Sequence, residues 1–237
     1  MEFDTALIVE NLPLYASGLW LTLQLVAIAL AAGMAIALPL GIARAIDAPL
    51  LGRAVAAYIY FFRSTPMLVQ LLLVYYGLGQ FKWLQAQWAA GNAFWLLFRE
   101  PYFCACLAFT LNTSAYTAEI IQGAIRNTPA GEIEAAKAVG MSATARMRRI
   151  VLPSALRRML QSYSNEVILM LQGSAVASAV TLVDLTGAGR TVYARSYAPF
   201  EAFAFTGLVY LLLTFAILGL FRLAERRWLV HLRPRGH

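Results

Sequence analysis

Long apolar segments alternate along the chain with shorter polar ones. A helix needs about 20 apolar residues to cross a bilayer. Five segments reach that length, at about residues 12–42, 66–84, 102–125, 163–183 and 200–223. Residues 54–62 are apolar but too short to span, so we expect them at the membrane surface or in the protein interior. The pattern predicts an all-α integral membrane protein with five transmembrane helices in a single domain, residues 1–237.

Composition supports this class. The chain is 60% hydrophobic and only 13% charged, whereas soluble domains carry about 25% charged residues. The acidic N-terminus, whose first basic residue is Arg44, is unlike a cleaved signal peptide. Cys104 and Cys106 lie two positions apart in an apolar segment, a spacing that suits packing rather than a disulfide or a metal. We therefore expect no metal site.

The distribution of basic residues predicts the orientation. Of the 19 Lys and Arg residues, three lie in residues 43–65, seven in residues 126–162 and five in residues 222–237. These three segments share one side of a five-span protein, and the other side holds the remaining four. Cytoplasmic loops of membrane proteins are rich in Lys and Arg. We expect the N-terminus outside, and residues 126–153 and the C-terminus in the cytoplasm.

Residues 126–153 are polar, lie between two apolar segments and predict a helix–turn–helix, which we call the elbow. Thr128 and Pro129 suit the start of the first helix, as a capping hydroxyl and a proline at the first helical position. Glu132 and Glu134 lie toward the positive end of its dipole. The pattern alone leaves two interpretations open, a docking site for a partner protein or an ordinary amphipathic loop.

Further helix boundaries follow from Gly, Ser and Pro. Gly140 can adopt the left-handed conformation that ends the first elbow helix, Ser142 can cap the second, and Pro153 is expected to stop it. Thr65 and Pro66 suit the start of the helix at 66–84 in the same way.

Residues 184–199 read as a polar loop on the outer side. Its charged residues, Asp184, Arg190 and Arg195, either contact an external partner or are solvated. The run at 82–101 is rich in tryptophan, which is typical of a membrane interface. His231 and His237, in the basic C-terminal tail, are expected to be solvated.

Five polar residues at membrane depth are candidates for a substrate path: Glu166, Asn165, Asn112, Glu119 and Gln70. A charge at mid-bilayer costs about 2.5–3.5 kcal/mol and usually faces the bundle interior. Glu166 is either a counter-charge for a cationic substrate or part of a salt bridge to Arg157, Arg158 or Arg63. For Glu119 we favour an ion pair with Arg63 or Arg126. For Asn112, Thr113, Gln70 and Gln24 we favour hydrogen bonds between helices over contacts to a ligand.

The sequence lacks the residues that several other activities would need. The sequence has no P-loop pattern, so ATP would have to be bound by another chain, and no cofactor is expected in this one. The predicted spans contain no Asp and no His, so we expect neither intramembrane catalysis nor catalytic residues. We also expect no nucleic-acid partner. A channel subunit without ATP coupling stays an alternative at this point.

The elbow residues carry a resemblance to a known family. Glu134-Ala135-Ala136, then Gly140, then Ile150-x-Leu152-Pro153, are similar to the EAA signature of ABC importer permeases. Three flanking segments resemble the polar amino-acid branch of this family: Phe62–Pro66, Leu111–Ile120 and Tyr163–Leu171. Within that branch the resemblance is closest to the M-type subunit of histidine/lysine/arginine/ornithine importers, and opine importers come next. Ser64 departs from the usual glycine. At Gln172–Ala175 the sequence also differs from the family pattern, because many relatives carry a charged residue there. The substrates of those relatives therefore cannot be assigned to this chain from the resemblance alone.

The resemblance implies a type I importer permease with cytoplasmic coupling helices in the plasma (inner) membrane of a bacterium. It implies a related permease subunit, as a heterodimer or alternatively a homodimer, two ATP-binding subunits and an extracytoplasmic amino-acid-binding protein. The implied substrates are histidine, arginine, lysine and ornithine, with opines (octopine, nopaline) or glutamine/glutamate as alternatives. The residues expected to couple to the ATPase are Glu132, Glu134, Ala135, Ala136, Gly140 and Pro153.

Overall fold

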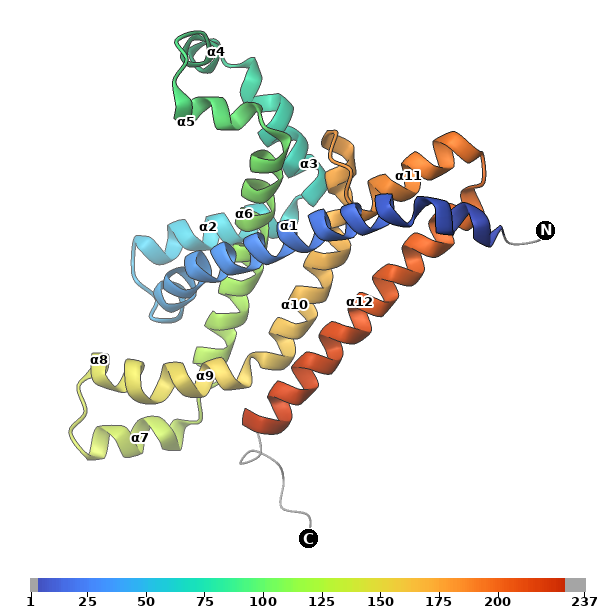
Figure 1. Cartoon of the computed structure of the whole chain (residues 1–237). Coiled ribbons are helices and arrows are strands. Elements are labelled where there is room, and N and C mark those ends of the chain that lie inside the picture. Colours follow the sequence, from blue (N-terminus) through green and yellow to red (C-terminus); the bar gives the residue numbers. More distant parts are fainter. Residues whose placement is uncertain (1–3, 229–237) are drawn as a thin grey trace.

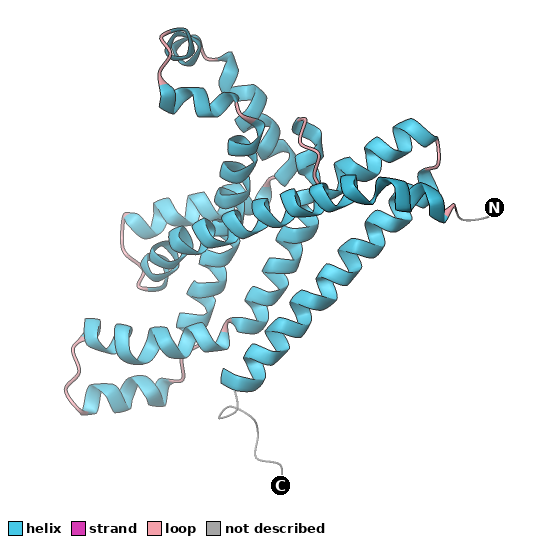
Figure 2. Cartoon of the chain, in the orientation of Figure 1, coloured by secondary structure: helices cyan, strands magenta, loops and turns pink. Residues whose placement is uncertain are grey.

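The computed structural model describes residues 4–228, and within that range all regular structure is helical (Figure 2). The helices are α1 (Thr5–Ala45), α2 (Leu51–Ser64), α3 (Met67–Leu72), η1 (Leu73–Gly77), η2 (Leu78–Gln80), α4 (Lys82–Ala89), α5 (Ala93–Leu96), η3 (Leu97–Arg99), α6 (Pro101–Arg126), α7 (Ala130–Ala138), α8 (Ala143–Arg146), η4 (Met147–Val151), α9 (Leu152–Arg158), α10 (Leu160–Gly173), η5 (Ser174–Val180), α11 (Leu185–Ser196) and α12 (Pro199–Trp228).

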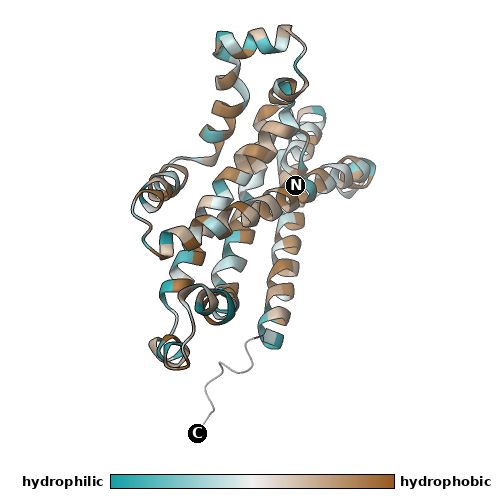
Figure 3. Ribbon diagram, turned by 90° about the vertical axis from the view of Figure 1, so that its left-hand side faces the viewer, coloured by the Kyte–Doolittle hydropathy of each residue, from teal (hydrophilic) through white to brown (hydrophobic). Residues whose placement is uncertain are grey.

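Two helices are long and apolar enough to cross a membrane alone, α1 and α12, and three further spans arise if each bent pair of helices counts as one. The bends are 105° between Leu51–Ser64 and Met67–Gln80, 86° between Ala93–Arg99 and Pro101–Arg126, and 50° between Leu160–Val180 and Leu185–Ser196. Figure 3 shows that α12 is hydrophobic over most of its length and hydrophilic at the end leading to the C-terminus. These five spans correspond to the five apolar segments of the sequence.

The centre of the fold is the pair α1 and α6, whose helices approach closely at small residues. A Cβ placed on Gly33 would lie 2.6 Å from Thr113 Cγ2, and one on Gly41 would lie 2.7 Å from Ile121 Cγ2. Small residues at helix interfaces allow such contact in lipid. A buried cluster around Leu25 and Phe109 extends this packing to α3 and α10.

We expect Gly41→Ala to lower the free energy of unfolding by about 1–3 kcal/mol, because the added methyl group overpacks the α1–α6 contact. Gly207→Ala is the matched control, since a Cβ on Gly207 meets nothing within 4 Å and alanine is the better helix former. Unfolding by SDS titration in mixed micelles measures both. Equal effects of the two substitutions would contradict this packing.

The short apolar stretch at 54–62 belongs to α2 and buries only one face, with Val55 and Ile59 in the core, whereas Tyr60 is 75% and Phe61 51% exposed. The prediction that Thr65 caps the next helix was wrong. Thr65 is the C-cap of α2, and its Oγ1 donates to the Phe61 carbonyl at 2.8 Å, while Pro66 is the N-cap of α3. The physical reason is that a residue before proline is pushed into extended backbone, which ends the preceding helix.

The prediction of a polar loop at 184–199 was also wrong, because α11 occupies it. Leu185, Ala188 and Val192 form a buried apolar stripe on this helix. Asp184 is its N-cap: Oδ1 accepts from the Gly187 N–H at 2.9 Å, and the residue is fully buried rather than solvated. Arg190 and Arg195 are exposed, which is compatible with both interpretations, partner contact and solvation.

The elbow and the tryptophan-rich segment lie at opposite ends of the molecule (Figure 1). α4 and α5 form a small hairpin at the top of the view, where the Trp83 and Trp95 rings meet edge to face at 4.9 Å. α7, α8 and α9 lie at the lower left. His231 and His237 lie outside the described residues.

Candidate functional site

The elbow is a hairpin of two antiparallel helical arms, α7 and the continuous run α8–η4–α9 (Figure 1). Gly140 adopts the predicted left-handed conformation, with φ +76°. Ser142 caps the second arm as predicted, its Oγ accepting from the Ala145 N–H at 3.3 Å. The turn between the arms is therefore set by the residues that the sequence indicated.

Two other predictions for the elbow were wrong. Thr128 does not cap α7, whose N-cap is Pro129 with no side-chain hydrogen bond. Pro153 does not stop the second arm, which continues to Arg158. A π-helical turn at Met147–Val151 precedes Pro153 and changes the hydrogen-bonding pattern there, so a residue without an N–H fits into the first turn of α9.

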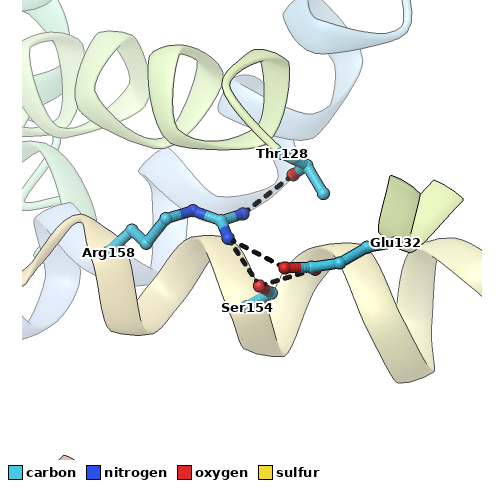
Figure 4. A network of polar contacts seen from close by, with 4 residues as sticks. All are labelled: Thr128, Glu132, Ser154 and Arg158. Atoms are coloured by element: carbon cyan, nitrogen blue, oxygen red, sulfur yellow. Dashed lines mark hydrogen bonds and ion pairs between the residues drawn. The ribbon is translucent and has the colours of Figure 1, made fainter. Parts of the chain in front are cut away.

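A polar network joins the base of α7 to α9 (Figure 4). Arg158 donates from Nη1 to Ser154 Oγ at 2.7 Å and from Nη2 to Thr128 Oγ1 at 3.1 Å. Its Nη1 also pairs with Glu132 Oε1 at 3.4 Å, and Ser154 donates to Glu132 Oε2 at 2.9 Å. Glu132, predicted to couple to the ATPase, thus has a contact within the chain that fixes the shape of the elbow.

Arg158→Met should loosen the elbow without unfolding the bundle, because it leaves Glu132 and Thr128 without their shared partner. We expect amide hydrogen exchange in Ala130–Ala138 to rise by about tenfold, the equivalent of 1.4 kcal/mol. The matched control is Arg157→Met, since Arg157 is exposed and forms no ion pair within residues 4–228. Unchanged exchange in the Arg158 variant would show that the network does not hold the hairpin.

The predicted coupling residues divide by exposure. Glu134, Ala135 and Gly140 are exposed near the turn of the hairpin, whereas Ala136 is buried against the second arm. Val139, at the C-cap of α7, is 76% exposed although it is apolar. The sequence reasoning missed Val139, whose only signal is a large apolar residue beside the helix-ending glycine.

The second feature is a cavity of about 400 Å³ between α2, α3, α6 and α10. Glu166 lines it and is buried, and Thr113 Oγ1 donates to Glu166 Oε1 at 2.7 Å. Of the two roles considered for Glu166, the salt bridge to Arg157, Arg158 or Arg63 does not occur within residues 4–228. A buried carboxylate with one hydroxyl donor retains acceptor capacity for a cation.

The amides at this cavity join the helices around it. Asn112 Nδ2 donates to Gln70 Oε1 at 2.9 Å, and Gln70 Nε2 donates to Thr65 Oγ1 at 2.7 Å and to the Phe62 carbonyl at 2.9 Å. The predicted bonds between helices are confirmed, and Asn112 also lines the cavity. Asn165 is exposed and does not line it.

Arg63 lies between this cavity and a second one of about 510 Å³. Its Nη1 lies 3.8 Å from Glu119 Oε1, which confirms the predicted ion pair, and its guanidinium lies 5.3 Å from the centre of the Tyr116 ring. The first cavity thus presents one carboxylate, Glu166, and one guanidinium, Arg63. Sequence reasoning named Arg63 only as a pairing partner and Thr113 only as a polar group expected to bond between helices, which its bond to Glu166 confirms. It missed Tyr116.

Comparison with known proteins identifies the family of this chain. The family model described as "binding-protein-dependent transport system inner membrane component" matches residues 37–230. The chain belongs to this family. The nopaline permease NocM of Agrobacterium fabrum is 40% identical over 232 residues, 98% of this chain and 95% of that protein. The histidine/lysine/arginine/ornithine permease HisM of Escherichia coli K12 is 43% identical over 218 residues, 92% and 90% of the two chains.

Solved structures agree with these relatives. An amino acid ABC transporter structure, described as "with histidines", matches with a TM-score of 0.82 and 31% identity, covering 96% of this chain and 100% of that one. The inward-facing methionine transporter MetNI has a TM-score of 0.73 at 21% identity and shows the shared fold alone. This inner-membrane component is the permease of an ABC amino-acid importer, with the type I fold predicted from the sequence.

Proposed function

We propose that this permease translocates basic amino acids, namely histidine, arginine, lysine and ornithine. The observation that carries the proposal is the buried Glu166 carboxylate, which lines the 400 Å³ cavity and forms no salt bridge within residues 4–228. Arg63, in the same cavity, can receive the substrate carboxylate in a charge-assisted hydrogen bond. The relatives named for histidine, lysine, arginine and ornithine support the same substrate class.

Opines are the alternative that a specific observation favours, because permeases named for nopaline and octopine are 40% and 41% identical to this chain. Glutamine or glutamate fits the cavity less well, since neither side chain offers a positive charge to Glu166. A channel subunit without ATP coupling would not need the elbow.

Partner subunits supply the energy in this proposal. Two ATP-binding subunits dock on the exposed tip of the elbow, an external amino-acid-binding protein delivers the substrate, and a related permease chain completes the pathway. ATP is bound by the partners, so this chain carries no cofactor and is not itself an enzyme. The N-terminus lies outside the bacterial plasma membrane, and the elbow and C-terminus lie in the cytoplasm.

The elbow suits the transmission of movement. Its arms are joined at the base by Arg158 and at the tip by a turn of defined geometry, so a push on Val139 moves the hairpin as one body. α6 leads directly into the first arm, and α10 follows the second. Because α6 carries Thr113 and α10 carries Glu166, such a movement reaches both walls of the cavity.

Competition for bound arginine tests the substrate class. The purified transporter complex, without the external binding protein, is loaded with radiolabelled arginine and challenged with lysine, ornithine, octopine, glutamine or glutamate. We expect lysine and ornithine to displace arginine at lower concentrations than glutamine or glutamate. Stronger displacement by octopine would favour the opine alternative, and equal displacement by glutamate would contradict a cation site at Glu166.

A further inference from the structure

A groove alongside the second arm of the elbow has no part in the transport pathway proposed above. It lies between the end of α1 and the second arm of the elbow and has a volume of about 470 Å³. Its apolar walls are formed by Ile42 and Ile46 on one side and by Met147, Val151 and Leu152 on the other. Apolar walls stabilise a bound hydrocarbon group, because they remove its surface from water and pack against it.

Two positive charges accompany these walls. Arg146 and Arg148 also line the groove. Within residues 4–228 neither side chain forms an ion pair, whereas Arg44 and Arg126 both pair with Asp47. An apolar groove with two unneutralised guanidinium groups is complementary to a molecule that joins a hydrocarbon chain to an anion.

The position of the groove identifies the source of that molecule. α1 is a membrane-spanning helix, and the groove lies where it ends, on the elbow side. The adjacent corner between α1 and α2 exposes large apolar side chains: Leu50 is 87% exposed, Ile46 59% and Leu51 56%. Exposed apolar residues beside arginines are typical of segments that sit in the lipid interface and attract anionic headgroups.

We propose that the groove binds an anionic phospholipid of the elbow-side leaflet. One acyl chain lies between α1 and the elbow, and the phosphate lies beside Arg146 and Arg148. The bound lipid fills the space between the second arm and α1 and so supports the elbow from the membrane side. The site does not depend on which amino acid the permease carries.

Lipid titration followed by native mass spectrometry tests the site. The full-length chain, purified with its partner subunits in detergent, is titrated with phosphatidylglycerol or with phosphatidylcholine of the same acyl chains. We expect phosphatidylglycerol to bind at least about tenfold more tightly, since both arginines attract the charge of the anionic headgroup. The double variant Arg146→Gln/Arg148→Gln should bind both lipids equally.

Two further variants keep the test specific. Arg149→Gln/Arg157→Gln removes the same charge from exposed arginines outside the groove and should keep the preference for phosphatidylglycerol. Thr144→Trp places a large ring on an exposed residue that lines the groove and should weaken binding of both lipids. Equal binding of the two lipids by the unmodified complex, loss of preference in the control variant, or displacement of the lipid by inorganic phosphate would each overturn the proposal.

Discussion

Glu166→Gln is expected to weaken arginine binding to the purified transporter by about ten- to hundredfold, because a hydrogen-bonded charge contributes roughly 1.5–3 kcal/mol. The substitution keeps the size of the side chain and its acceptor for Thr113, which donates to the present carboxylate at 2.7 Å. It removes only the negative charge that faces the cavity. Equilibrium binding of radiolabelled arginine, measured without the external binding protein, isolates this effect.

Two controls separate charge from structure in this experiment. Glu225→Gln makes the same change in charge near the end of α12, far along the chain from the cavity, and should leave binding unchanged. Thr113→Val keeps the carboxylate but removes its hydroxyl donor and should have a smaller effect than Glu166→Gln. Arginine binding by Glu166→Gln at the affinity of the unmodified protein would assign Glu166 to structure instead.

Gly140→Val is expected to abolish co-purification of the ATP-binding subunits. Gly140 has φ +76°, and left-handed backbone costs about 1–2 kcal/mol for a residue with a Cβ, more when it is β-branched. A Cβ at this position meets nothing within 4 Å, so the substitution acts through the backbone and not through a clash. The strained turn displaces Val139 and Ala135, which form the exposed tip.

Gly140→Asn is the matched control, since asparagine tolerates left-handed backbone, and should retain most of the bound ATPase. Glu134→Lys tests the same surface without altering the backbone, because Glu134 is exposed and forms no ion pair within residues 4–228. It should also lose the ATPase. Full retention of the ATPase by both Gly140→Val and Glu134→Lys would contradict docking at the elbow.

The sequence predicted most of the fold because the membrane restricts which segments can span it. α6 begins and ends within one residue of the predicted span at 102–125. The prediction failed at α11, since glycines and arginines in residues 184–199 concealed an apolar stripe of only three side chains. It also failed at Pro153, because a π-helical turn accommodates the proline and hydropathy carries no signal for such a turn.

The turn of the elbow could be predicted from the sequence better than the cavity could. The turn of the elbow depends on local backbone chemistry, so Gly140 and Ser142 could be read directly. The cavity depends on which faces of α6 and α10 meet, which a single sequence does not specify. Tyr116 and the pairing of Thr113 with Glu166 therefore emerged only from the structure, and Asn165, adjacent in sequence to Glu166, lies on an exposed face.

Uptake of radiolabelled arginine by proteoliposomes that contain the complete transporter tests most directly whether ATP drives this permease through its elbow. ATP is enclosed in the lumen, on the elbow side, and the external binding protein and the substrate are supplied outside the vesicles. We expect accumulation against a gradient that requires ATP and is lost in Gly140→Val, while arginine binding to that variant persists. Accumulation without ATP, or ATP-driven uptake by Gly140→Val at the rate of the unmodified protein, would contradict this account.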